Sequence, residues 1–240
     1  MFWNPGGRQV YNGLLVKLDK RFSRRYQFTA SYSLSRTSGY NSLYNQDNWK
    51  ASWADGKVSN QLNVVATVDM RWGFQLGSIT AFGTKGTGDV TVGNADLTGS
   101  GNTTTPLPGL ALNCINISCG QAEVTAAVNN WNSTYAGKKD ARGTTLAALQ
   151  VPTHFFTGRN SFSQDLRLTK TFKLRSENYK LALFGEVFNL FNYANLQGQG
   201  YGLDAATSAN ASFGVPTRRA GQVFGSGGPR AFQIGGRFTF

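Results

Sequence analysis

The feature that most constrains the fold is a strict alternation of apolar and polar residues over long segments. From Tyr26 to Ser35 every second residue is apolar or aromatic, and the residues between them are Gln, Thr or Ser. Residues 232–240 repeat the pattern. A period of two places the two sets of side chains on opposite faces of a β-strand. Several of these segments reach the about 9–11 residues of a tilted transmembrane strand, whereas soluble strands have about 5–6, so a membrane sheet is favoured.

The same pattern predicts seven strands joined by connections of alternating length. The expected strands span about 13–22, 25–36, 60–71, 73–84, 162–173, 178–192 and 230–240. Three connections are a few residues long, and the other three, 37–59, 85–161 and 193–229, are rich in Gly, Asn, Ser and Thr. Outer-membrane barrels combine short periplasmic turns with long extracellular loops. The expected fold class is therefore all-β, an antiparallel transmembrane β-barrel segment.

Seven strands are expected to form an incomplete barrel. Single-chain bacterial barrels have even strand numbers, and an open edge in lipid leaves backbone groups without hydrogen-bond partners. The N-terminal residues MFWNPGGRQV contain no charged segment followed by an apolar run, so no signal peptide is expected within the chain. We therefore interpret the chain as part of a larger barrel.

The alternation also assigns charged residues to the polar face, which is expected to line the barrel interior. These lumen-facing charges include Arg167, Lys180, Glu186 and Arg237, and Arg71 is assigned to the same face. Glu186 is placed to pair with Arg167 or Lys180, or to contact a substrate. A salt bridge facing water is the simpler interpretation, because charges on a lumen face need no special role.

The excess of basic residues favours a membrane partner. The chain has 24 Lys and Arg against 12 Asp and Glu, a formal net charge of +12. Most of this excess falls in turns and loops, for example at Arg24, Arg25, Arg218 and Arg219. Those positions are expected to meet phosphates of outer-membrane lipid and lipopolysaccharide, which argues against nucleic acid as the partner.

The C-terminal segment, QIGGRFTF, resembles the assembly signal of bacterial outer-membrane barrels. The match consists of a polar residue at Gln233, a small residue at Gly235, and aromatic residues at Phe238 and Phe240. The resemblance implies that the barrel-assembly machinery recognises this strand.

Further segments resemble the C-terminal strands of TonB-dependent receptors of the Oar-like group. They are Tyr11–Phe22, Gly158–Asn160, Asp165–Phe172 and the stretch FGEVFNLFN at Phe184–Asn192. The resemblance implies that residues 1–240 are the C-terminal part of a barrel of about 22 strands around a plug, with the plug and the signal peptide absent. It also implies a location in the bacterial outer membrane and coupling to the TonB complex through an N-terminal region.

Three functions remain open at this point. The first is energy-coupled transport, in which the barrel wall and the extracellular loops capture a small-molecule, glycan or peptide ligand. The second is an outer-membrane structural or adhesin-type barrel that displays its loops without transport. The third is a soluble β-rich enzyme or sugar-binding module, which would have to explain the long alternating strands.

The loops contain candidate contacts but no catalytic or cofactor motif. Tyr40, Tyr44, Trp49 and Trp53 are expected either to stack on a ligand or to pack within the loop. Cys114 and Cys119 are expected to close a small disulfide ring if their loop lies outside the cell. His154 is the only histidine, and it has no neighbouring nucleophile or ligand set. We therefore expect no enzyme activity, no metal and no cofactor.

Overall fold

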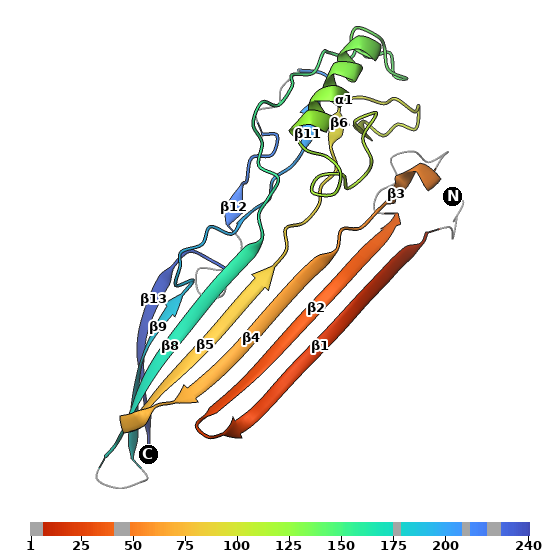
Figure 1. Cartoon of the computed structure of the whole chain (residues 1–240). Helices are drawn as coiled ribbons and strands as arrows, with labels where there is room; N and C mark the ends of the chain where they lie inside the picture. Colours follow the sequence, from red (N-terminus) through yellow and green to blue (C-terminus); the bar gives the residue numbers. More distant parts are fainter. Residues whose placement is uncertain (1–6, 41–48, 175–178, 208–211, 220–226) are drawn as a thin grey trace.

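The computed structural model describes residues 7–40, 49–174, 179–207, 212–219 and 227–240. Its main element is an antiparallel sheet in which seven long strands lie side by side in chain order (Figure 1). The strands are β1 (Gln9–Ser23), β2 (Tyr26–Tyr40), β4 (Ser59–Asp69), β5 (Phe74–Gly83), β8 (Ser161–Lys173), β9 (Lys180–Phe188) and β13 (Ala231–Thr239). All seven expected strands are present, so the predicted antiparallel fold is confirmed.

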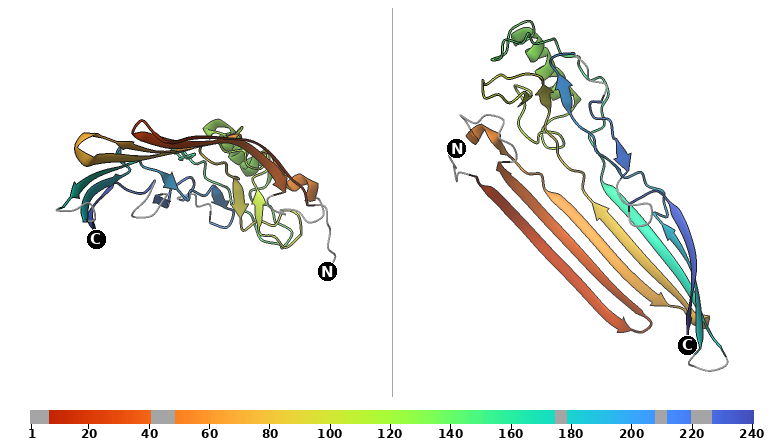
Figure 2. Two further views of the ribbon diagram at one scale, coloured as in Figure 1. Left: turned by 90° about the horizontal axis from the view of Figure 1, so that it is seen from below. Right: turned by 180° about the vertical axis from the view of Figure 1, so that it is seen from behind.

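The sheet is curved and open. Each long strand pairs with the next one along the chain, and β1 and β13 pair with only one long strand each among those described. The sheet bends across its width (Figure 2). An open, curved sheet of strands 9 to 15 residues long is consistent with an incomplete barrel. No helix in the described ranges is long and apolar enough to cross a membrane.

Short turns lie at one end of the sheet and long connections at the other (Figure 1). The β1–β2 turn has Arg24 and Arg25 at φ of 50° and 73°. Two consecutive positive φ values are typical of the type I′ hairpin turn, which usually contains Asn and Gly. The β4–β5 turn contains the short helix η2 (Arg71–Gly73). The assignment of Arg71 to a strand face is therefore wrong, because the chain reverses direction at this residue.

The strand predicted at 178–192 is shorter in the structure. It ends at Phe188, because Asn189 has a φ of 47° and turns the chain out of the sheet. A short polar side chain such as Asn tolerates this left-handed conformation better than most residues.

The long connections fold into a second unit, which we call the loop domain (described residues of 87–157 and 200–214). It contains the helix α1 (Gln121–Thr134) and a three-stranded sheet of β6 (Thr91–Gly93), β7 (Thr104–Pro106) and β11 (Gly202–Asp204). Val124, Ala127, Val128 and Trp131 of α1 are buried at the spacing of one helix face. Apart from Ala54, every buried apolar side chain among the described residues belongs to the core of this domain.

Four small elements lie at the loop end of the sheet. The helix η1 (Trp49–Ser52) leads into β3 (Trp53–Ala54), which pairs with the end of β2. The strands β10 (Leu196–Gln197) and β12 (Arg218–Arg219) form a two-stranded ribbon at the loop end of the sheet. The loop end of the sheet therefore continues directly into the loop domain (Figure 1).

Candidate functional site

The register of the sheet places polar and charged side chains on one face. Residues that are directly opposite each other on antiparallel strands share a face. Arg167 on β8 lies opposite Glu186 on β9, and Glu186 lies opposite Gln233 on β13. Arg167, Lys180, Glu186 and Arg237 all have the parity of this polar face. The other face carries aliphatic and aromatic side chains, for example Leu168 and Ile234.

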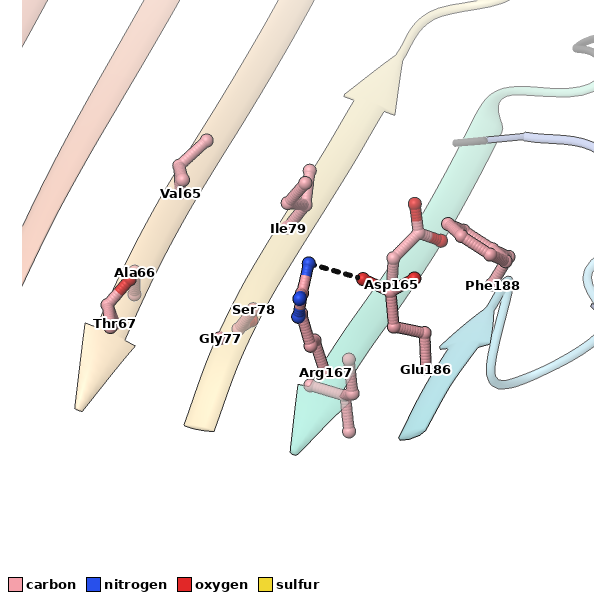
Figure 3. A pocket seen from close by; sticks show the side chains of 11 residues that line it. Val65, Ala66, Thr67, Gly77, Ser78, Ile79, Asp165, Arg167, Glu186 and Phe188 are labelled. Atoms are coloured by element: carbon pink, nitrogen blue, oxygen red, sulfur yellow. Dashed lines mark ion pairs between the residues drawn. The ribbon is translucent and has the colours of Figure 1, made fainter. Parts of the chain in front are cut away.

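Arg167 and Glu186 form an ion pair between β8 and β9 on the polar face (Figure 3). The Arg167 Nη1 atom lies 3.1 Å from Glu186 Oε1. The guanidinium of Arg167 also lies 3.9 Å from the centroid of the Phe184 ring, a cation–π geometry that holds it in place. Of the two basic residues expected to pair with Glu186, it is therefore Arg167 that does so in the structure.

Lys180 and Arg237 lie away from this pair, towards the short-turn end. Lys180 is opposite Lys173 and Thr239, and Arg237 is opposite Ala182. Six residues separate Lys180 from Glu186 along β9, or about 20 Å at the usual strand rise. A Lys180–Glu186 salt bridge is excluded by this distance.

A cavity of about 250 Å³ lies on the polar face beside the ion pair (Figure 3). Arg167 and Glu186 form part of its wall, and Asp165 and Phe188 close it towards the loop end. The neighbouring strands contribute small residues here, including Gly77 on β5, which leaves room for water or a solute. The cavity wall thus combines the ion pair with apolar side chains such as Val65 and Ile79. Within the described ranges, no three His, Cys, Asp or Glu side chains are grouped to hold a metal ion.

A buried cluster around Asp165 and Asn189 fixes the loop end of this wall. The backbone N–H of Asn189 and the hydroxyl of Ser163 both donate to Asp165 Oδ1, at 2.7 and 2.9 Å. The Asn189 Nδ2 group donates to the carbonyl oxygens of Tyr193 and Gly228. This cluster was not predicted from the sequence, although the Asn residues within FGEVFNLFN are a signal for a turn with side-chain to backbone hydrogen bonds.

The aromatic residues proposed as ligand contacts fall in the 37–59 connection. The rings of Tyr40 and Trp53 pack edge to face with centroids 5.2 Å apart. The indole N–H of Trp53 donates to Asp55 Oδ1 at 3.4 Å. Tyr44 lies outside the described residues, and Trp49 begins η1. Tyr40 and Trp53 thus pack against each other in the structure, which is the second of the two arrangements expected for them.

A disulfide and two buried, hydrogen-bonded carboxylates stabilise the loop domain. Cys114 and Cys119 form a disulfide with Cα atoms 5.0 Å apart, and Cys114 is part of the core. Asp96 accepts backbone hydrogen bonds from Thr98, Gly99 and Gly101, which hold its pKa below the ordinary value although burial opposes ionisation.

Asp140 is the second buried carboxylate, and it joins distant segments of the loop domain. It accepts hydrogen bonds from the backbone N–H groups of Asp96, Arg142 and Thr144, and its Oδ2 atom lies 2.9 Å from Arg142 Nη2. Burial raises the pKa of Asp140, but these hydrogen bonds outweigh it and lower the pKa from 3.8 to about 2. The carboxylate is therefore ionised at neutral pH, with its charge fully hydrogen-bonded.

Gln233, Gly235 and Phe238 of the C-terminal signal lie in β13, an edge strand of the described sheet, and Phe240 directly follows it. A Cβ atom added at Gly235 would lie 2.9 Å from Cε1 and Cε2 of Phe184 and closer still to Cζ, because the Phe184 ring covers this glycine. The small residue is thus required by a neighbouring aromatic ring rather than by a bend in the strand. Phe238 stacks between Tyr179 and Phe240, at the short-turn end, while Gln233 lies opposite Glu186.

Comparison with known proteins gives one match. The model of a family described as "Outer membrane beta barrel domain" matches residues 2–233. No curated protein and no solved structure matches the chain. The family match, at residues 2–233, covers nearly the whole sequence.

Proposed function

The chain belongs to the outer membrane beta barrel domain family and lies in the bacterial outer membrane, and from this premise we propose that it forms part of a TonB-dependent receptor. In this function the polar face of the seven-strand sheet lines the passage through the barrel, and the apolar face contacts lipid. The loop domain stands at the extracellular end and takes part in ligand capture. Passage is driven by the TonB complex, and the barrel-assembly machinery inserts the protein.

One observation carries this proposal: charged side chains occur along one face of the sheet from the short-turn end to the end that meets the loop domain. Lys180 and Arg237 lie near the turns, Arg167 and Glu186 lie at mid-sheet, and Asp165 adjoins the loop end. A hydrated, charged wall below a folded extracellular unit is what a solute passage requires. The resemblance of FGEVFNLFN to the Oar-like receptors supports the assignment to the TonB-dependent group.

A second candidate function is an adhesin-type or structural barrel. It is favoured by the loop domain, which has its own apolar core and a disulfide and is therefore suited to display at the cell surface. In that function the wall only anchors the displayed domain, and no solute crosses it.

Solute depletion from a defined medium separates the two functions. Cells with and without the gene are grown in parallel, and the solutes removed from the medium are measured by mass spectrometry with and without an uncoupler of the proton gradient. TonB-dependent transport predicts that a solute is depleted only by cells with the gene and that the uncoupler abolishes the depletion. Depletion that is the same in both strains would contradict transport, and surface binding that survives the uncoupler would favour the adhesin.

A further inference from the structure

Two cavities of about 300 Å³ each lie where the strands meet the loop domain. They share the segment Thr84–Gly86 as a common wall. One cavity extends to the β10–β12 ribbon and is lined by Arg159 and Arg218, the other is lined by Lys57, and Lys85 lines both. We refer to these four cations and their two cavities as the basic neck.

Among the described residues, the basic neck is lined by cations without acidic side chains: none of the named wall residues of either cavity carries a carboxylate. In the described part of the chain, ion pairs join Lys17 to Asp19, Arg36 to Asp55, Arg142 to Asp140 and Arg167 to Glu186, and none involves a cation of the neck. The acidic residues nearest in the chain have other contacts: Asp55 pairs with Arg36, and Asp89 accepts the backbone N–H of Asn113, a residue that lines the second cavity.

Lys57 and Lys85 are in direct contact, and Arg159 and Arg218 share the lining of the first cavity with Lys85. Lys57 Nζ donates to the carbonyl oxygen of Lys85 at 3.4 Å, and the backbone N–H of Lys85 donates to Asn160 Oδ1 at 3.0 Å. Burial, together with the positive charge of Lys85, lowers the pKa of Lys57. The guanidinium of Arg159 lies 5.6 Å from the Tyr193 ring centroid. Like charges held together in this way attract a multiply charged anion.

Glycines let the backbone approach the first cavity. Gly158 and Gly198 line it and have φ values of +86° and +78°. A Cβ atom at Gly198 would lie 3.5 Å from Cγ of Arg218 and closer to Thr217 Oγ1. A larger residue at this position would therefore be strained and would overlap the Thr217 hydroxyl beside Arg218.

The basic neck opens on the polar side of the sheet. Ser35 and Ser59 line the second cavity and pair with each other on the polar face. Ser161 lines the first cavity and also lies on the polar face, because it is opposite Gly83 and Gly83 is opposite Gln61 on that face. Lipid headgroups contact a barrel from its apolar side, so the neck faces water at the mouth of the barrel interior.

We propose that the basic neck binds a water-borne, multiply charged anion whose phosphate or carboxylate groups bridge Lys57, Lys85, Arg159 and Arg218. The proposal rests on the receptor function above and names the ligand class for it. Guanidinium and ammonium groups form charge-assisted hydrogen bonds with such oxyanions, and arginine does so in a bidentate geometry. The two adjoining cavities suit an anion with more than one charged group.

The test is titration calorimetry with inorganic pyrophosphate, on protein extracted in detergent from outer membranes in which it has been expressed. The Arg159→Gln/Arg218→Gln variant removes two cations of the neck. Lys138→Gln/Lys139→Gln removes two exposed lysines of the loop domain that line neither cavity, and it serves as the matched control. We expect saturable binding that is at least tenfold weaker in the neck variant and changed by less than twofold in the control. Heat-modifiable migration confirms that each variant is folded.

Three results would overturn the proposal. They are absence of saturable pyrophosphate binding at millimolar concentration, equal weakening in the neck and control variants, and binding to phosphatidylglycerol vesicles that pyrophosphate does not displace. The last result would assign the cations to lipid headgroups. The receptor function is tested separately by the solute-depletion experiment. If the protein binds pyrophosphate but cells show no energy-dependent depletion, only the transport function is contradicted. If the neck variant still depletes the solute and the protein does not bind pyrophosphate, only the anion site at the basic neck is contradicted.

Discussion

The sheet exposes its apolar side chains, whereas the loop domain buries them. Ile234 of β13 is 89% exposed, and Leu183 and Phe232 share its face. Trp131 of α1 is fully enclosed by the core of the loop domain. A domain that buries its apolar side chains folds in water, whereas a sheet that presents them outwards needs hydrocarbon around it. One part of the chain is therefore suited to hydrocarbon and the other to water, and the two parts meet at the basic neck.

The largest effect is expected from removing Trp131. The Trp131→Ala substitution deletes the largest buried side chain and the hydrogen bond that its indole N–H donates to the carbonyl oxygen of Ala147 at 3.1 Å. We expect the loop domain to lose about 3–5 kcal/mol, as is usual for large-to-small core substitutions. Limited proteolysis should cleave the loop domain rapidly while heat-modifiable migration of the sheet is unchanged. Trp72→Ala, at an 81% exposed turn, is the matched control and should leave proteolysis unaltered.

Reduction of the Cys114–Cys119 disulfide should also act on the loop domain alone. The ring is short, and the chain-entropy model gives about 2 kcal/mol for a loop of this length. Thermal unfolding of the loop domain, followed by proteolysis with and without reductant, measures the effect. A Cys114→Ser/Cys119→Ser variant should resemble the reduced protein. An equal loss of stability in the sheet would contradict the separation of the two units.

Gly235→Ala tests the sheet in turn. The new methyl group would overlap the Phe184 ring, and we expect a loss of about 1–2 kcal/mol because the ring must move. Urea unfolding in detergent measures the change. Gly185→Ala is the control, since nothing lies within 4 Å of a Cβ at that position. In a Phe184→Ala background the cost of Gly235→Ala should vanish, and a cost that persists would mean that the strand itself requires glycine.

Acid should weaken the loop domain through Asp140. Because the folded state lowers the pKa of Asp140 from 3.8 to about 2, the carboxylate stabilises the fold fully above about pH 4, and this contribution is lost as the pH falls towards 2. Proteolysis of the loop domain across this range should show the loss. The Asp140→Asn variant should be weaker at neutral pH and less dependent on pH, and an unchanged pH profile would contradict the assignment.

The smallest effect is expected at the Arg167–Glu186 pair. The side chains are 48% and 16% exposed, and pairs open to solvent contribute less than about 1 kcal/mol. Glu186→Gln should therefore leave urea unfolding of the sheet nearly unchanged. A loss above about 2 kcal/mol would mean that the pair is sealed from water, and the polar face could then not line a hydrated passage.

The sheet was predictable from the sequence because its information is local. Alternation alone located the strands and gave the faces of Arg167, Glu186 and Ile234, since parity is conserved along each strand. The exceptions are turns. Arg24 and Arg25 take positive φ without the usual Asn-Gly signal, and Asn189 ends β9 at a point that only the turn preference of Asn signals.

The loop domain was not predictable because its core is assembled from distant segments. Val92 of β6 lies beside Leu203 of β11 in a parallel pair, and the helix α1 covers them with residues from between the two. The same holds for the basic neck, where Lys57, Lys85, Arg159 and Arg218 come from the three long connections of the sheet. In the sequence these cations are scattered among loops, and only the tertiary fold shows that they share two cavities.

The central claim is that hydrocarbon surrounds the apolar face of the sheet. Spin labels on single cysteines introduced at Phe232, Gln233 and Ile234, in protein embedded in lipid bilayers, test it most directly; the native cysteines are paired in a disulfide and do not react. We predict that oxygen dissolved in lipid relaxes the labels at 232 and 234, and that a water-soluble nickel complex relaxes the label at 233. Equal exposure of all three labels to the nickel complex would contradict the account.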